Sequence, residues 1–296
     1  MTKKKIKTIA QYKEDFVPEG LSSDKILENR YLYSMTKYDE NDNVIEDERF
    51  DAQGAPGEKE VKFYDDKGHL TESKSILHGE VAEHKSYEYQ NGKLKREYVH
   101  YVDGAKDTVE YDYEDGKLKK KLFYDEDHEL EKSISFEREP GKLSEITKDE
   151  DGGVIEEKQQ VFNNDLLVEE SYTDHFSGTS YRVKYSYDDS GREKASQRFD
   201  SEGGLLESVE KTYDEEGNLI RLEDVENQRV VVMEYDDQGN NILQEERMED
   251  GTVVSTISRA FDADGLHISS EVFLNGMGQQ MSQRYNVYRE YEFFNL

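Results

Sequence analysis

The amino-acid sequence predicts an all-β fold: an elongated antiparallel array of β-hairpins, with about 20 strands and a hairpin repeat of about 25 residues. Two observations support this prediction. Turn signals built from Asp, Asn and Gly recur about every 12 residues between positions 50 and 280. The residues between these turns alternate between apolar and polar side chains, which is the pattern of a strand buried on one face.

Several turns of a first series have the form Tyr-Asp-x-x-Gly, as in the stretch YDEEGNL at residues 213–219, and the others are variants of it. An Asp at the start of such a turn accepts hydrogen bonds from nearby backbone N–H groups, and glycine adopts a positive φ at little cost. We therefore interpret the motif as a hairpin turn and not as a ligand site. The predicted turn glycines of this series are Gly68, Gly92, Gly116, Gly141, Gly191, Gly217, Gly239 and Gly265.

A second series of turns lies midway between the first, for example at Gly104 and Gly203. The runs 108–113, 130–136 and 181–187 lie between turns and have a period of two. The last of them, YRVKYSY, places three tyrosines and a valine on one face and Arg, Lys and Ser on the other. Such alternation predicts strands with a single apolar face.

A single sheet of these strands would be about 95 Å wide at about 4.8 Å per strand. An apolar face of that size cannot remain fully exposed to water. We therefore expect the sheet to coil, to fold back on itself or to be covered by a partner.

The two ends of the chain depart from the repeat, which is expected to occupy residues 36–280. Terminal repeats lack one neighbour and need atypical capping elements. Residues 1–35 contain a proline and a Ser-Ser pair before a helix-compatible run, and they predict a short N-terminal cap or, alternatively, a partner-binding arm. Residues 281–296 lose the turn signals and predict a last capping strand or a docking tail. The candidate docking residues in this tail are Tyr291, Phe293 and Phe294.

The composition narrows the class of partner. The formal charge is −30 at pH 7, so nucleic acids and anionic membranes are unfavourable ligands and a basic protein is a natural one. The 11% aromatic content argues against a disordered acidic chain. The absence of Cys excludes disulfides, thiolate nucleophiles and Cys-based metal sites. Without a signal-like apolar segment or a membrane-spanning run, the expected location is the cytoplasm.

No motif for catalysis or for a metal ion is present. The stretch 39–43, DENDN, matches the start of a calcium-binding loop, but Val44 replaces the required glycine. The seven histidines have no metal-ligand spacing, and no pair of the 69 carboxylates is distinguished as a catalytic pair. Phosphate-binding loops and nucleophile elbows are absent as well. We expect no enzyme activity, no cofactor and no metal.

One basic cluster stands out from the acidic background. Lys93 and Lys95 recur 24 residues later as Lys117 and Lys119. That offset predicts that equivalent residues stack in columns along the sheet. The columns are explained either by a ladder of salt bridges to carboxylates on the intervening strands or by a stripe that binds anions, and we take these four lysines as candidate partner-binding residues.

The Tyr-Asp turns give the sequence a recognisable resemblance. The stretches YDDKGHL at 64–70, YDDSG at 187–191, YDEEGNL at 213–219 and YDDQG at 235–239 resemble the YD repeats of the Rhs and teneurin proteins. The resemblance extends over roughly residues 38–270 and implies a spiralling sheet of β-hairpins. It does not imply toxin delivery, since no separate C-terminal toxin domain is recognised. Short repeat proteins of bacteria, some of them antitoxin-like, are an equally good analogy.

The sequence thus predicts a non-enzymatic scaffold that binds another protein through a long acidic β-sheet surface. Tyrosine, of which the chain has 21, is enriched in protein interfaces. Two alternatives remain at this stage. One is an antitoxin-like or immunity-like inhibitor of a basic toxin or nuclease, and the other is a carbohydrate-binding repeat protein.

Overall fold

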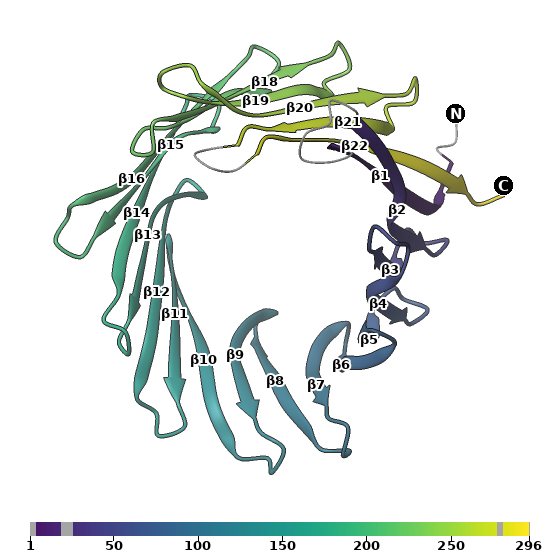
Figure 1. Cartoon of the computed structure of the whole chain (residues 1–296). Coiled ribbons are helices and arrows are strands. Elements are labelled where there is room, and N and C mark those ends of the chain that lie inside the picture. Colours follow the sequence, from purple (N-terminus) through teal and green to yellow (C-terminus); the bar gives the residue numbers. More distant parts are fainter. Residues whose placement is uncertain (1–3, 19–25, 277–280, 296) are drawn as a thin grey trace. The chain divides into compact units, whose positions relative to one another are not determined.

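The computed structural model describes residues 4–18, 26–276 and 281–295. Within them, all regular secondary structure is β-strand, and the 22 strands follow one another through short turns (Figure 1). The all-β prediction is therefore confirmed. The strands are β1 (Ile6–Pro18), β2 (Ile26–Tyr38), β3 (Val44–Phe50), β4 (Pro56–Tyr64), β5 (Leu70–Leu77), β6 (Glu80–Gln90), β7 (Lys93–His100), β8 (Lys106–Glu114), β9 (Lys117–Tyr124), β10 (Leu130–Glu139), β11 (Lys142–Asp149), β12 (Val154–Asn163), β13 (Leu166–Asp174), β14 (Ser180–Tyr187), β15 (Glu193–Asp200), β16 (Leu205–Tyr213), β17 (Leu219–Asp224), β18 (Arg229–Tyr235), β19 (Asn241–Met248), β20 (Val253–Phe261), β21 (His267–Leu274) and β22 (Gln283–Phe293).

The strands belong to two compact units. Unit 1 consists of Met1–His84, Tyr213–Arg221 and Arg229–Leu296, and unit 2 consists of Lys85–Thr212 and Leu222–Gln228. In unit 2, each strand from β7 to β16 is hydrogen-bonded antiparallel to the next. In unit 1, the same pattern joins β1 to β5 and β18 to β22.

The first and last strands of the chain pair with each other. β1 and β22 form an antiparallel ladder in unit 1, in which Ala10 lies opposite Glu290 and Asp15 lies opposite Tyr285. The prediction of an elongated array with a coiled or folded sheet is therefore wrong, because the terminal strands of such an array would remain apart. The pairing has a clear physical reason: each terminal strand satisfies the backbone groups that the other would leave unpaired at a sheet edge.

The predicted N-terminal cap is also wrong. The described part of residues 1–35 consists of β1 and most of β2, two 13-residue strands paired with each other. β2 continues the ladder to β3 through Ser34 and Arg49. Because β1 pairs on both sides, it is an interior strand and needs no capping element. The predicted helix-compatible run lies partly in residues 19–25, outside the described residues.

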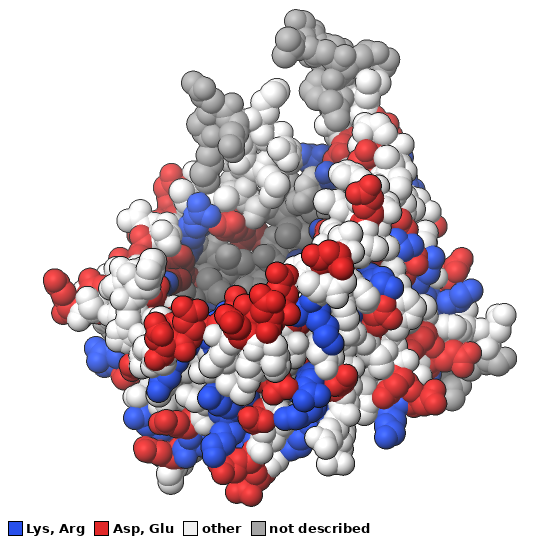
Figure 2. Space-filling view, turned by 90° about the horizontal axis from the view of Figure 1, so that it is seen from below, with Lys and Arg blue, Asp and Glu red and all other residues white. Residues whose placement is uncertain are grey.

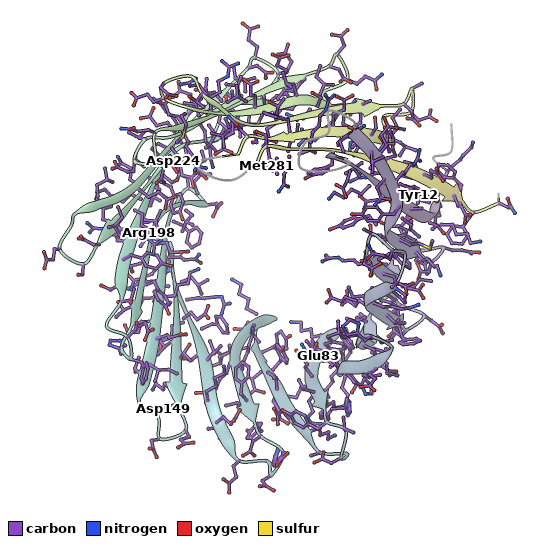
Figure 3. All side chains as sticks on the ribbon, viewed as in Figure 1. Tyr12, Glu83, Asp149, Arg198, Asp224 and Met281 are labelled. Atoms are coloured by element: carbon purple, nitrogen blue, oxygen red, sulfur yellow. The ribbon has the colours of Figure 1, made fainter. Side chains whose placement is uncertain are left out.

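The sheet has no thick apolar core. Among the described residues, Val272 is the only large apolar side chain that is nearly inaccessible, at 7% exposure. Figure 3 shows side chains leaving both faces of the strands. Their apolar parts are covered by neighbours on the same face: Arg198 lies 4.0 Å above the ring of Tyr181, and Lys106 lies 3.8 Å above Tyr98. Cross-strand pairs of rings and charged stems therefore take the place of a second layer.

Candidate protein interface

The Tyr-Asp turns are closed by the carboxylate of their own aspartate. Asp65 Oδ1 accepts hydrogen bonds from the backbone N–H groups of Lys67 and His69, both at 2.9 Å. Gly68 has φ = 80°, a conformation that other residues adopt only with strain. All eight glycines named for this series have positive φ. The same carboxylate-to-backbone bond recurs at Asp39, Asp51, Asp125, Asp149, Asp188, Asp200, Asp214, Asp236 and Asp262.

These bonds leave the turn carboxylates poorly suited to hold a cation. In the Asp236 turn, the second carboxylate oxygen accepts a bond from the Asn240 side chain at 2.9 Å. The side-chain amide of Asn240, followed by its backbone N–H, lowers the pKa of Asp236. The backbone N–H of His69 does the same for the pKa of Asp65. Within the part of the chain that the structure describes, no group of three or more His, Asp or Glu side chains could hold a metal ion.

Four tyrosine hydroxyls bond a hairpin to the preceding one, a role that the sequence did not reveal. The Tyr64 hydroxyl donates to the backbone carbonyl of Val44 at 3.0 Å, at the start of β3. Three further tyrosines donate in the same way to a carbonyl near the start of a strand in the preceding hairpin. These bonds are Tyr187 to Leu167 at 2.6 Å, Tyr235 to Leu219 at 2.9 Å and Tyr291 to His267 at 2.7 Å.

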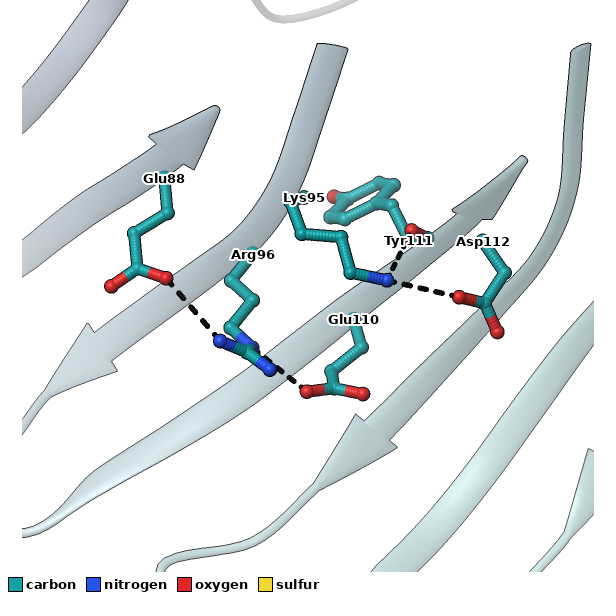
Figure 4. A network of polar contacts seen from close by, with 6 residues as sticks. All are labelled: Glu88, Lys95, Arg96, Glu110, Tyr111 and Asp112. Carbon is teal, nitrogen blue, oxygen red and sulfur yellow. Dashed lines mark hydrogen bonds and ion pairs between the residues drawn. The ribbon is translucent and has the colours of Figure 1, made fainter. Parts of the chain in front are cut away.

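The candidate basic cluster lies in unit 2, on β7 and β9, and three of its four lysines contact carboxylates or the backbone. In the network drawn in Figure 4, Lys95 Nζ lies 3.0 Å from Asp112 on β8. Arg96 bridges Glu88 at 3.6 Å and Glu110 at 2.8 Å. This arrangement corresponds to a salt ladder. Exposed pairs of this kind contribute about 0–1 kcal/mol each.

The remaining lysines of the cluster differ in their surroundings. Lys93 lies 4.9 Å above the Tyr113 ring and donates to the carbonyl of Gly116. Lys119 pairs with Glu114 at 3.0 Å, and Lys117 is exposed at the start of β9. Lys93 and Lys95 line an open depression of about 400 Å³ whose other lining residues are Gln90, Asn91, Leu94, Tyr111, Asp112 and Tyr113.

The register does not stack residues that are 24 positions apart. Arg96 pairs with Glu110, and Glu110 pairs with Leu122 on β9. Neighbouring positions on β7 and β9 are thus 26 residues apart (122 − 96). The predicted columns are displaced by two residues along the strand, because the turns between strands set the register.

The three candidate residues of the C-terminal tail lie at the junction with β1. Tyr291 lies opposite Ile9, and Phe293 lies opposite Ile6. The Phe294 backbone N–H donates to the carbonyl of Lys5 at 3.0 Å. The backbone of this segment is therefore occupied by pairing within the chain.

The two strand ends of unit 2 differ in exposed apolar side chains. Because consecutive turns of an antiparallel sheet alternate between its ends, the second series of turns lies together at one end. We call this the acidic end; it comprises residues 101–107, 124–131, 149–154, 174–180, 200–206 and 224–228, with Asp149 labelled in Figure 3. Its exposed apolar side chains are Tyr101, Val102, Val154, Phe176, Leu205, Leu206 and Val225. Val102 is fully exposed and Phe176 is 95% exposed.

The opposite end of unit 2 holds the turns of the first series. We call this the glycine-lysine end; it comprises residues 90–93, 113–117, 138–142, 163–166 and 187–194. Among these residues, Tyr113, at 37%, is the only exposed large apolar side chain. Exposed apolar groups are therefore concentrated at the acidic end.

Acidic residues, like the exposed apolar residues, are concentrated at the acidic end. The acidic end contains 15 Asp and Glu residues and a single Lys or Arg residue. The glycine-lysine end contains 7 Asp and Glu residues and 6 Lys and Arg residues. The lone cation, Lys106, lies above the ring of Tyr98. Over the face of the molecule seen in Figure 2, acidic and basic side chains are interspersed. The uneven division is thus a local property of the strand ends.

Local hydrogen bonds fix part of the acidic end. The Tyr101 hydroxyl donates to the Asp107 carboxylate, and this bond raises the pKa of Tyr101 to about 12. The hydroxyl of Ser177 donates to Asp174 at 2.6 Å and lowers the pKa of that carboxyl. Other carboxylates at this end are exposed and project from the turns, among them Glu126, Asp127, Glu150, Asp151, Glu202 and Glu226. The sequence shows the individual turns of the second series. Only the pairing of the strands shows that these turns lie together at one end.

Comparison with known proteins shows no matching family model and no matching curated protein. Among solved structures, the chain is similar to the Photorhabdus luminescens Tc holotoxin pore with the mutation TccC3-D651A, at 14% identity and a TM-score of 0.34. The match covers 81% of this chain and 15% of that one. The complex TcdB2-TccC3-Cdc42 is matched at 14% identity and a TM-score of 0.30, over 84% of this chain and 16% of that one. The chain thus spans about a sixth of the length of these two structures.

A second kind of similar structure is a porin-like protein from Bacteroides uniformis, at 8% identity and a TM-score of 0.36. In this case the match covers 97% of this chain and 98% of the other.

The cytoplasmic location predicted from the sequence has to be corrected. The described part of the chain contains no helix with the length and apolar character of a membrane span. That prediction treated an apolar helix as the only membrane-spanning element. The lack of an apolar helix therefore does not place this chain in the cytoplasm.

Proposed function

We propose that this chain is a non-enzymatic protein-binding module and that the acidic end of unit 2 is its binding surface. The observation that carries the proposal is the exposure of apolar side chains on turns that lie together at this end. Phe176 and Val102 project into solvent, although smaller or polar residues would close the same turns. Exposed apolar groups of this kind, gathered in one region, are typical of protein interaction sites.

The partner is a protein and not a nucleic acid, because a chain with 30 excess negative charges repels phosphate backbones. Inhibition of a basic toxin or nuclease is a special case of the same function. That case would require in addition that the partner loses its own activity when it is bound.

We also propose that the hairpins are a divergent form of the YD repeat. Two observations support the relationship: the aspartate closes the turn, and the tyrosine before it bonds to the preceding hairpin, as at Tyr64 and Asp65. The same two bonds occur at Tyr187 and Asp188 and at Tyr235 and Asp236.

Site-specific photo-crosslinking in the native host tests the binding function. A photoreactive amino acid replaces Phe176 at the acidic end, or Ser190, an exposed turn residue at the glycine-lysine end, as the matched control. We expect a discrete crosslinked protein from position 176 and none from position 190. The partner, once purified, should bind the unmodified chain and lose at least tenfold in affinity for the variant Val102→Ser/Phe176→Ser. Binding that is unaffected by these substitutions would refute the proposed surface.

A further inference from the structure

The proposed function leaves open which kind of protein the acidic end binds, and the charges of its turns narrow the choice. Apolar and acidic side chains alternate along the same segments. Val102 precedes Asp103, Leu205 follows Glu202 within the same turn, and Val225 precedes Glu226. A partner that covers the apolar side chains must also approach these carboxylates.

We infer that the occupant of the acidic end is a positively charged polypeptide segment that carries apolar side chains among its Lys or Arg residues. This inference rests on the proposed function. Its basis is charge complementarity: the acidic end has 15 carboxylates against one cation. An uncharged or acidic partner would bury several of these carboxylates without a counter-charge, which is costly.

The arrangement of the turns suits an extended or helical segment. Successive turns of the acidic end are separated by two strands, which is about 10 Å. An extended chain advances about 3.3 Å per residue and would reach a new turn about every three residues. A helix advances 1.5 Å per residue and would do so about every two turns of helix. A segment of modest length therefore meets several of the acidic turns at once.

A second copy of this chain does not fit the same surface. Two acidic ends would repel each other, because both carry a large excess of carboxylates. The glycine-lysine end has 7 acidic and 6 basic residues, so it provides no net positive charge to attract an acidic end. Self-association through this surface is therefore disfavoured.

The test uses the full-length chain and a defined probe, a 14-residue amphipathic peptide made only of Lys and Leu. Two double variants are compared, each of which changes the net charge from −30 to −26 (−30 + 4). Glu126→Lys/Glu150→Lys alters the acidic end, and Glu139→Lys/Asp189→Lys alters the glycine-lysine end. All four positions are exposed, so substitution leaves the fold intact, which circular dichroism verifies.

We expect the acidic-end variant to bind the peptide about tenfold more weakly than the unmodified chain, with a shallower dependence on salt. The affinity of the variant Glu139→Lys/Asp189→Lys for the peptide should lie within twofold of that of the unmodified chain. A Lys-Ser peptide of equal charge should bind more weakly than the Lys-Leu peptide, because it lacks apolar side chains. Equal loss in both double variants would refute the inference, since net charge alone would then explain binding, and so would an unchanged affinity of the acidic-end variant.

The outcome separates this inference from the proposed function. If the crosslinked partner binds through Phe176 but is insensitive to salt and to the acidic-end charge reversal, the binding surface stands and the basic occupant is refuted. If neither the apolar substitutions nor the charge reversals affect partner binding, the binding surface itself is refuted.

Discussion

Removing the hydroxyl groups that join successive hairpins should destabilise the protein in proportion to the number removed. Tyr187→Phe deletes the hydroxyl that donates to the Leu167 carbonyl at 2.6 Å and preserves the ring. A hydrogen bond of this type contributes about 1 kcal/mol, and a partly buried carbonyl left without a partner adds to the loss. We therefore expect the free energy of unfolding to fall by about 1–2 kcal/mol for each hydroxyl.

The quadruple variant Tyr64→Phe/Tyr187→Phe/Tyr235→Phe/Tyr291→Phe multiplies this effect. The four bonds join different hairpins and share no residue, so their effects should add to at least about 4 kcal/mol. Urea denaturation followed by circular dichroism measures the change. With a slope of about 3 kcal/mol per molar urea, the midpoint should fall by more than about 1 M.

The matched control is Tyr113→Phe. Among the described residues, the hydroxyl of Tyr113 forms no hydrogen bond, and this residue is 37% exposed. Its midpoint should be unchanged. If the quadruple variant unfolded at the same urea concentration as this control, the hydroxyl bonds would not stabilise the repeat, and the structural role assigned to the tyrosine would be refuted.

Three further predictions concern the fold. The double variant Ala10→Cys/Glu290→Cys should form a disulfide on oxidation, because these residues lie opposite each other on β1 and β22 and the chain has no other Cys. Failure to form this bond would contradict the pairing of the terminal strands. Gly217→Ala should lower the free energy of unfolding by about 1 kcal/mol or more in urea titrations, because φ at this position is 94°; an unchanged midpoint would rule out strain there. The pKa of Asp236 is lowered mainly by the Asn240 side chain, so the stability it contributes is present above pH ~4 and is lost as pH falls through the lowered pKa. Asn240→Ala should reduce the loss of stability between pH 4 and pH 2, and an identical acid profile would contradict this linkage.

Local sequence patterns predict the strands and turns of the repeat, although not β1 and most of β2. The run 181–187 alternates in exposure along β14 as its two-residue period predicts, with Arg182 and Lys184 exposed and Val183 half-buried. The turn at Gly217 has the positive φ expected of the Tyr-Asp turn. These features depend on interactions within about 12 residues, namely the alternation of side chains along a strand and the bonds of an aspartate to its own turn. Patterns of this kind can be recognised in the sequence because they do not depend on distant residues.

The pairing of strands that lie far apart in the chain could not be derived from the sequence. The ladder between β1 and β22 joins residues about 280 positions apart, and no local pattern identifies the partner of a terminal strand. Register was equally inaccessible: Arg96 is aligned with Leu122 and not with the residue one 24-residue repeat later, because each turn and bulge shifts the alignment. The same pairing gathers Val102, Phe176 and Val225 at one end of unit 2, so a surface that the sequence divides among separate turns is assembled only by hydrogen bonds between strands.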